Sequence, residues 1–150
     1  MLLCQPDSEN LNSAERLPTY FMDTLSKYLA VAAGSALGGM ARYFVANTWL
    51  GQFAAPFPSA TFVINVSGSF ILGLFATLAA EKFSFNPHFN LAVAVGFVGA
   101  YTTFSTFEYE TARLVSRAEL AKAALYVALS VLAGFLAVQA GIALARLGTR

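Results

Sequence analysis

Residues 96–107 read GFVGAYTTFSTF, and this is the most informative stretch of the sequence. It ends a run from Phe83 to Phe107 that contains no charged residue, and about 20 apolar residues are enough for a helix to cross the hydrocarbon core of a bilayer. The run therefore predicts a transmembrane helix. Two glycines and four serine or threonine residues lie near the middle of this helix.

The polar middle of this helix predicts a break in it. Hydroxyl side chains compete with the helix for backbone hydrogen bonds, and glycine adds backbone freedom. Irregular backbone at membrane depth survives only where it is buried in protein or lines an aqueous path, and its carbonyl and amide groups can then bind ions. We expect an ion site at the break.

Charge-free runs on both sides of this helix predict three more spans. Residues 43–80 and 123–145 carry no charge, and Pro56 and Pro58 divide the first run between two helices. The chain is 57% hydrophobic and 11% charged, against about 25% charged residues in a typical soluble domain. A soluble four-helix bundle would need polar outer stripes, which the second and fourth helices lack. We expect an all-α integral membrane protein with transmembrane helices over residues 27–50, 59–80, 89–115 and 119–147.

The first 24 residues are polar and lack the basic, apolar and small-residue regions of a signal peptide. We expect residues 1–24 to form a disordered tail ahead of one transmembrane domain over residues 25–150. Translation could also start at Met22. Cys4 is the only cysteine, so no disulfide can form within the chain.

The basic residues give a weak orientation signal. Apart from Arg42, which lies inside the first span, five lie on the side of the two termini and three on the other side: Arg16, Lys27, Lys82, Arg146 and Arg150 against Arg113, Arg117 and Lys122. Because lysine and arginine asymmetry sets orientation, a fixed topology with the N-terminus inside and a dual topology with antiparallel pairing both remain open. The net charge of +1 argues against a nucleic-acid surface.

The first span combines a packing motif with a charge. Gly34 and Gly38 form a GxxxG pair that favours close approach of another helix. Arg42 lies roughly 6 Å past the middle of the span at 1.5 Å per residue. It could snorkel to the interface, attract an anion or bind another helix.

Further polar side chains mark the other spans. Thr61, Asn65 and Ser69 follow one another at i, i+4 spacing on the second helix, as Tyr126 and Ser130 do on the fourth. Such tracks serve either an ion path or inter-helix hydrogen bonding.

The aromatic and charged residues after the polar stretch are also candidates. Phe104 and Phe107, three residues apart, usually indicate packing, but their electropositive ring edges could contact a small anion. Glu110 and Arg113 are also three apart, and we expect them to pair near the interface.

Three motifs together resemble one family. They are Gly38-Gly39 with Arg42-Tyr43, the stretch TFVINVSGSF over residues 61–70, and GFVGAYTTFSTF over residues 96–107. With these, the chain resembles the CrcB/Fluc fluoride channels over all four spans. Ala100 departs from the second glycine that the family often has.

The resemblance implies an antiparallel, dual-topology homodimer in the bacterial inner membrane that exports fluoride from the cytoplasm and so reduces its toxicity. It implies a structural sodium ion at the dimer centre, bound by the carbonyl groups of Gly99 and Thr102. The residues that it implies for the fluoride pathway are Asn65, Phe104, Phe107, Tyr126 and Ser130. Accessory candidates are Arg42, Ser69, Thr103, Ser105, Thr106 and Glu110.

Three other functions compete with a channel. A small multidrug-type transporter exchanges protons through a membrane-buried carboxylate, but the first two spans contain no Asp or Glu. A non-transporting subunit would use the polar tracks only for helix packing. An enzyme is disfavoured, because the single histidine, His88, follows Pro87 in a loop with no evident nucleophile partner.

Overall fold

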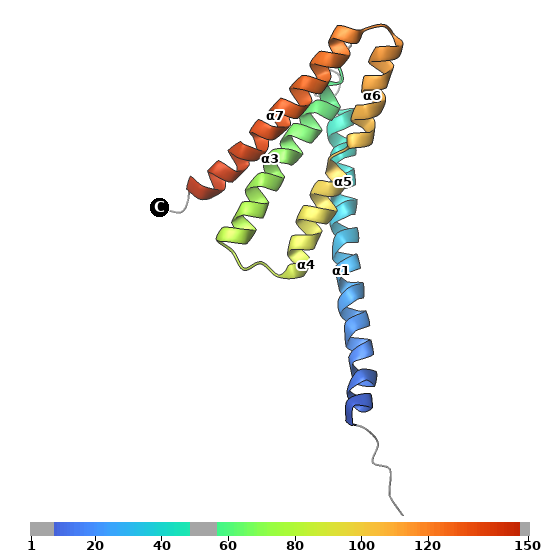
Figure 1. Ribbon diagram of the computed structural model, residues 1–150, viewed down its shortest axis with the longest axis vertical. Coiled ribbons are helices and arrows are strands. Elements are labelled where there is room, and N and C mark those ends of the chain that lie inside the picture. Colours follow the sequence, from blue (N-terminus) through green and yellow to red (C-terminus); the bar gives the residue numbers. More distant parts are fainter. Residues whose placement is uncertain (1–7, 49–56, 148–150) are drawn as a thin grey trace, which may run out of the picture.

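The computed structural model describes residues 8–48 and 57–147, and all regular structure in these residues is helical (Figure 1). The elements are α1 (Ser8–Asn47), α3 (Ser59–Glu81), α4 (Pro87–Asn90), the π-helix η1 (Leu91–Val98), α5 (Gly99–Tyr101), α6 (Phe104–Ser116) and α7 (Leu120–Leu147). Four segments are long and apolar enough to cross a membrane: Tyr20–Asn47, Ser59–Glu81, Pro87–Ser116 and Leu120–Leu147. The predicted all-α membrane fold with four spans is therefore confirmed. Residues 49 and 50 of the first predicted span lie outside the described residues.

The first helix is longer than a membrane requires. α1 has 40 residues, or roughly 60 Å at 1.5 Å per residue, whereas the hydrocarbon core is about 30 Å thick. Its N-terminal half projects beyond α4 (Figure 1). Residues 1–7 of the predicted tail lie outside the described residues, and α1 begins at Ser8. A helix nucleated in the span gains one hydrogen bond for each residue added, which favours its continuation.

Glycines bring α1 against the third span. α1 packs mainly along η1. A Cβ atom at Gly34 would collide with the carbonyl group of Ala92, and one at Gly38 with the carbonyl group of Phe97. Gly39 has open space around it instead. The packing role predicted for the GxxxG pair is therefore confirmed.

The second and fourth spans form the other close pair, α3 with α7 (Figure 1). A Cβ atom at Gly73 would collide with the carbonyl group of Val138, and Gly141 is equally close to the backbone of α3. At one end of the pair, Arg146 Nη2 lies 2.7 Å from Glu81 Oε1. Small residues thus let both helix pairs approach backbone to backbone, which supplies packing energy where lipid offers no hydrophobic drive.

The third span is a series of segments rather than one continuous α-helix. After η1 and α5, Thr102 has φ −78° and ψ 158° and Thr103 has φ −150° and ψ 112°, and α6 then begins at Phe104. Both threonines are extended, a conformation that suits β-branched side chains. Ala100 lies within α5, so alanine is no obstacle at that position.

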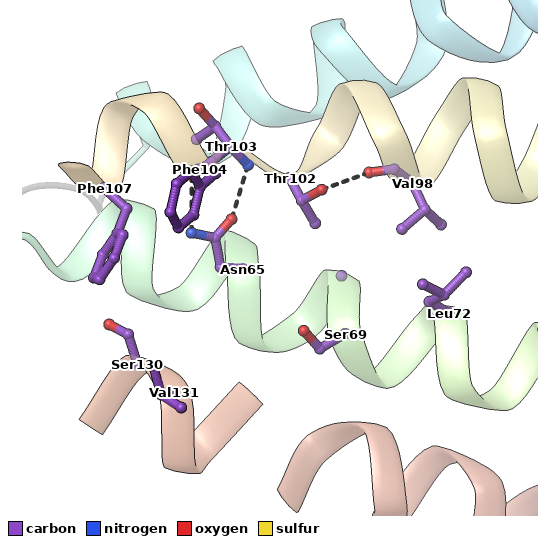
Figure 2. A pocket seen from close by; sticks show the side chains of 11 residues that line it. Asn65, Ser69, Leu72, Val98, Thr102, Thr103, Phe104, Phe107, Ser130 and Val131 are labelled. Carbon is purple, nitrogen blue, oxygen red and sulfur yellow. Dashed lines mark hydrogen bonds between the residues drawn. The ribbon is translucent and has the colours of Figure 1, made fainter. Parts of the chain in front are cut away.

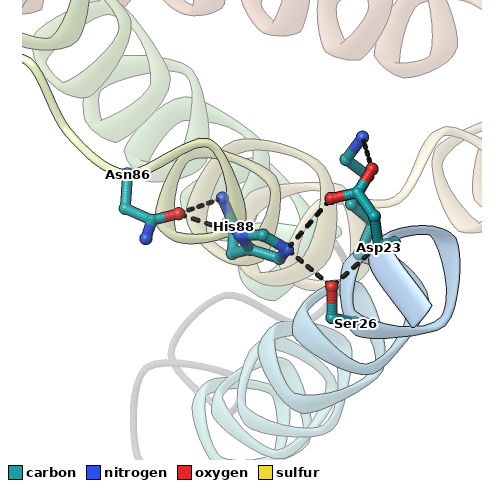
Figure 3. Close-up of polar contacts among 5 residues, drawn as sticks. Asp23, Ser26, Asn86 and His88 are labelled. Carbon is teal, nitrogen blue, oxygen red and sulfur yellow. Dashed lines mark hydrogen bonds and ion pairs between the residues drawn. The ribbon is translucent and has the colours of Figure 1, made fainter. Parts of the chain in front are cut away.

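A polar cluster fixes the start of the third span on α1 (Figure 3). The His88 ring lies with Nε2 2.7 Å from Ser26 Oγ and with Nδ1 2.9 Å from Asn86 Oδ1. Asp23 adds an ion pair to Lys27 at 2.6 Å and lies 4.0 Å from His88 Nε2. Both ring nitrogens of His88 therefore have structural partners.

Candidate functional site

A cavity of about 310 Å³ lies beside the two extended threonines (Figure 2). α3, the third span and α7 all contribute to its wall, which contains polar groups but no charged side chain. The lining residues are Asn65, Gly68, Ser69, Leu72, Val98, Thr102, Thr103, Phe104, Phe107, Ser130 and Val131. The structure thus brings four of the five predicted pathway residues to one cavity.

Asn65 binds both backbone polar groups of Thr103 at the break. Its Nδ2 donates to the Thr103 carbonyl oxygen at 3.0 Å, and its Oδ1 accepts from the Thr103 backbone N–H at 2.8 Å (Figure 2). A buried peptide group outside a helix needs such partners because hydrocarbon offers none. The Asn65 amide therefore replaces the helical hydrogen bonds that Thr103 lacks.

The hydrogen bonds of the two threonines leave two carbonyl groups without their usual helical donors. In a regular α-helix the Thr103 N–H would bind the Gly99 carbonyl and the Thr106 N–H would bind the Thr102 carbonyl. Here the Thr103 N–H donates to Asn65, and the Thr106 N–H donates to Thr103 Oγ1 at 3.3 Å as an N-cap of α6. Gly99 is exposed, with open space where a Cβ atom would lie.

The two phenylalanines of the third span occupy different environments. Both line the cavity, but Phe104 is 75% exposed whereas Phe107 is 7% exposed. Their ring centroids are 5.9 Å apart. Phe107 in turn contacts the fully buried ring of Tyr126, at a centroid distance of 5.1 Å. Tyr126 therefore supports the wall of the cavity through Phe107 and does not line it.

Glu110 binds two hydroxyl groups next to this wall. Thr61 Oγ1 donates to Glu110 Oε1 at 2.9 Å, and the Tyr126 hydroxyl donates to Oε2 at 2.8 Å. The predicted pairing of Glu110 with Arg113 is wrong. Arg113 is exposed, and the partners of the Glu110 carboxylate are instead the two hydroxyl groups from α3 and α7.

Ser130 brings a spare polar group to the cavity. Its Oγ is buried, yet it makes no hydrogen bond to the part of the chain that the structure describes. Ser69 lines the same cavity from α3. Buried hydroxyl groups nearly always have a partner, so an unpaired one at a cavity wall indicates a site for water or an ion.

Arg42 lies at a second cavity of about 460 Å³, whose wall also includes Gly39, Thr61, Thr103 and Thr106. Thr103 lines both cavities, so the break separates them. Arg42 is half-buried there. Arg42 thus brings a positive charge to a cavity that shares Thr103 with the cavity lined by Ser130.

One accessory candidate lies away from both cavities. Ser105 is exposed and is not among the residues that line these two cavities. Within residues 8–48 and 57–147 no group of three or more His, Cys, Asp or Glu residues could hold a metal ion. The hydrogen bond between Ser67 and Tyr101, at 2.9 Å, was not foreseen. Both lie in the quoted motifs, but no spacing rule connects them.

Sequence comparisons relate the chain to one family of proteins. The family model "CrcB-like protein, Camphor Resistance (CrcB)" matches residues 29–142. The chain is 46% identical over 116 residues to the fluoride-specific ion channel FluC of Acidobacterium capsulatum, covering 77% of this chain and 93% of that protein. It is 46% identical over 117 residues to FluC of Methylococcus capsulatus, covering 78% of this chain and 51% of that protein. It is 42% identical over 123 residues to FluC of a Sulfurihydrogenibium species, covering 82% and 99%.

Proposed function

The chain belongs to the CrcB family, and we propose that it is a fluoride-selective channel that carries fluoride out of the cytoplasm and so reduces its toxicity. The proteins that it resembles are named fluoride-specific ion channels, so the chain is not an enzyme. Its four apolar spans make it a multi-pass membrane protein. We propose the bacterial inner membrane as its location.

The observation that carries the proposal is a cavity at the helix break, whose largely apolar wall contains several uncharged polar side chains and no charged one. Fluoride is small and strongly hydrated, so a selective path must replace its water with hydrogen-bond donors. Ser130 offers an unpaired buried hydroxyl, Ser69 a second hydroxyl, and the rings of Phe104 and Phe107 can present electropositive edges. Because none of these groups is fully charged, the ion can leave as well as enter.

Charged residues near the path have separate roles in this proposal. Arg42 raises the local concentration of anions in the second cavity, as a positive charge in a cleft does. The Glu110 carboxylate accepts hydrogen bonds from Thr61 and Tyr126 and thereby fixes both hydroxyl groups beside the path. The negative charge of Glu110 therefore faces the hydroxyl groups of Thr61 and Tyr126.

We propose that the functional unit is an antiparallel homodimer with two pathways. Gly99 supports this, because a glycine in the middle of a span that is exposed and surrounded by open space suits close approach by a second copy. The five-to-three distribution of basic residues is weak enough for insertion in both orientations. Two antiparallel copies would bring both breaks to the middle of the bilayer.

The break also fits a structural sodium ion. Hard cations prefer oxygen ligands, and the carbonyl groups of Gly99 and Thr102 have lost their usual helical donors to Asn65 and Thr103. We propose that these carbonyl groups from both copies bind the ion. When bound, the ion would supply a positive charge that stabilises the contact between the breaks of the two copies.

Fluoride efflux from liposomes tests the function. Protein reconstituted into liposomes loaded with potassium fluoride should release fluoride on addition of a potassium ionophore, measured with a fluoride electrode, and liposomes loaded with chloride should release much less anion. Efflux at the rate of protein-free liposomes, or equal passage of chloride, would contradict the proposal. The first result would favour a non-transporting packing subunit.

A further inference from the structure

Ser67 and Tyr101 join α3 to the end of α5 immediately before the break. Ser67 Oγ lies 2.9 Å from the Tyr101 hydroxyl. Tyr101 is the last residue of α5 and is buried, and its ring stacks on Phe97 at 5.8 Å with an interplanar angle of 10°. The contact therefore fixes the point at which the helix ends.

The surroundings of Ser67 determine the direction of this hydrogen bond. Ser67 Oγ lies 2.7 Å from the Val63 carbonyl oxygen and 3.2 Å from that of Ile64. A carbonyl oxygen can only accept, so the single hydroxyl proton of Ser67 is used within α3. The Tyr101 hydroxyl is therefore the donor to Ser67 Oγ.

Three neighbouring residues of α3 each contact a different residue around the break. Asn65 binds the Thr103 backbone, and Ser67 accepts from Tyr101. Gly68 leaves room for the Thr102 side chain, whose methyl group a Cβ atom at position 68 would meet. Both ends of the two-residue break are thus bound to the same turn of α3.

We propose that Ser67 and Tyr101 are positioning residues for the sodium site: their hydrogen bond fixes the end of α5 on α3, and with it the carbonyl groups of Gly99 and Thr102. This inference rests on the proposed function. Gly99 is the first residue of α5, and Thr102 is the residue directly after the last one. Rotation of α5 would therefore displace the carbonyl groups of Gly99 and Thr102 together. Asn65 alone, which binds beyond Thr102, does not prevent that rotation.

Three variants test the pair: Ser67→Ala, Tyr101→Phe and the double variant. Ser67→Ala removes the acceptor and leaves the buried Tyr101 hydroxyl without a partner. Tyr101→Phe removes the donor and leaves Ser67 bonded to Val63. The single variants therefore lose the same contact, but only Ser67→Ala creates an unsatisfied buried group. Thr77→Val is the control, since it removes a hydroxyl that bonds within α3 to the Gly73 carbonyl.

The readout is the thermal unfolding midpoint of each purified protein titrated with sodium chloride at constant ionic strength. A ligand that binds the folded state raises this midpoint with its concentration. We expect both single variants to need about tenfold more sodium for half of the maximal rise, equivalent to about 1.4 kcal/mol. The double variant should shift no further than either single one, and Thr77→Val should match the wild type. Without sodium, Ser67→Ala should have a lower midpoint than the double variant.

Two results would overturn the inference. If the sodium dependence is unchanged in both single variants while their baseline midpoints fall, the contact is only structural. If the wild-type midpoint does not respond to sodium at all, the sodium site itself is absent and the positioning role is refuted with it. Fluoride efflux from wild-type liposomes separates this second case from failure of the channel function.

Discussion

Asn65→Asp tests the role of the residue that binds the Thr103 backbone at the break. The new carboxylate keeps an acceptor for the Thr103 N–H but places an oxygen 3.0 Å from the Thr103 carbonyl oxygen, where the amide now donates. A fluoride ion that passes about 4 Å from this charge meets a repulsion of about 4 kcal/mol at an effective dielectric constant of about 20. Since 1.36 kcal/mol is a factor of ten in rate, conduction should fall by about 10³.

Asn65→Ala is the matched comparison because it adds no charge. It leaves the N–H and the carbonyl group of Thr103 without partners, at a cost of about 1–3 kcal/mol each. We therefore expect a lower thermal midpoint than for the wild type, and a smaller loss of flux than for Asn65→Asp. Both variants should be assayed by fluoride efflux after size-exclusion chromatography shows monodisperse protein. If Asn65→Asp conducts as fast as the wild type, Asn65 does not border the fluoride path.

Three further outcomes follow from the packing and the hydrogen bonds. Phe104→Ile and Phe107→Ile should both reduce fluoride efflux, but only Phe107→Ile, at the buried position, should also lower the thermal midpoint; unchanged efflux in both would refute the role of the rings. Gly38→Leu should prevent stable folding, because the leucine side chain would meet the backbone of η1. Gly39→Leu should fold, since position 39 has open space around it. Equal expression of the two variants would contradict the packing of α1 on η1. Glu110→Gln should cost about 1–3 kcal/mol in unfolding experiments, because its amide nitrogen cannot accept the second hydroxyl donor, and an unchanged stability would show that these hydrogen bonds contribute little.

The sequence predicted the membrane fold well because hydrocarbon imposes a length and an apolar composition that can be read locally. The close packing of another helix at Gly34 and Gly38 was also predicted, since close helix contacts in membranes select small residues. The π-helical form of Leu91–Val98 was not predicted, because this apolar run carries no local signal that separates it from an α-helix.

The polar partners were harder to predict. The i, i+4 track on α3 placed Thr61 and Asn65 on one face, but their partners lie 49 and 38 residues away in the chain. Such pairs depend on how α3 meets the third span, which no local pattern specifies. The expected partner of Glu110 was wrong for the same reason, because spacing along one helix says nothing about the hydroxyl groups that neighbouring helices present.

The length of α1 has a practical consequence. A continuous helix that runs from Ser8 into the bundle is a rigid support for a fused domain, because no flexible linker separates its projecting part from the first span (Figure 1). A small fluorescent or antibody-binding domain grafted onto that part would sit at a defined angle to the membrane. In a pair of oppositely inserted copies, two such markers would stand on opposite faces of the bilayer, so electron microscopy could count the copies in each orientation directly.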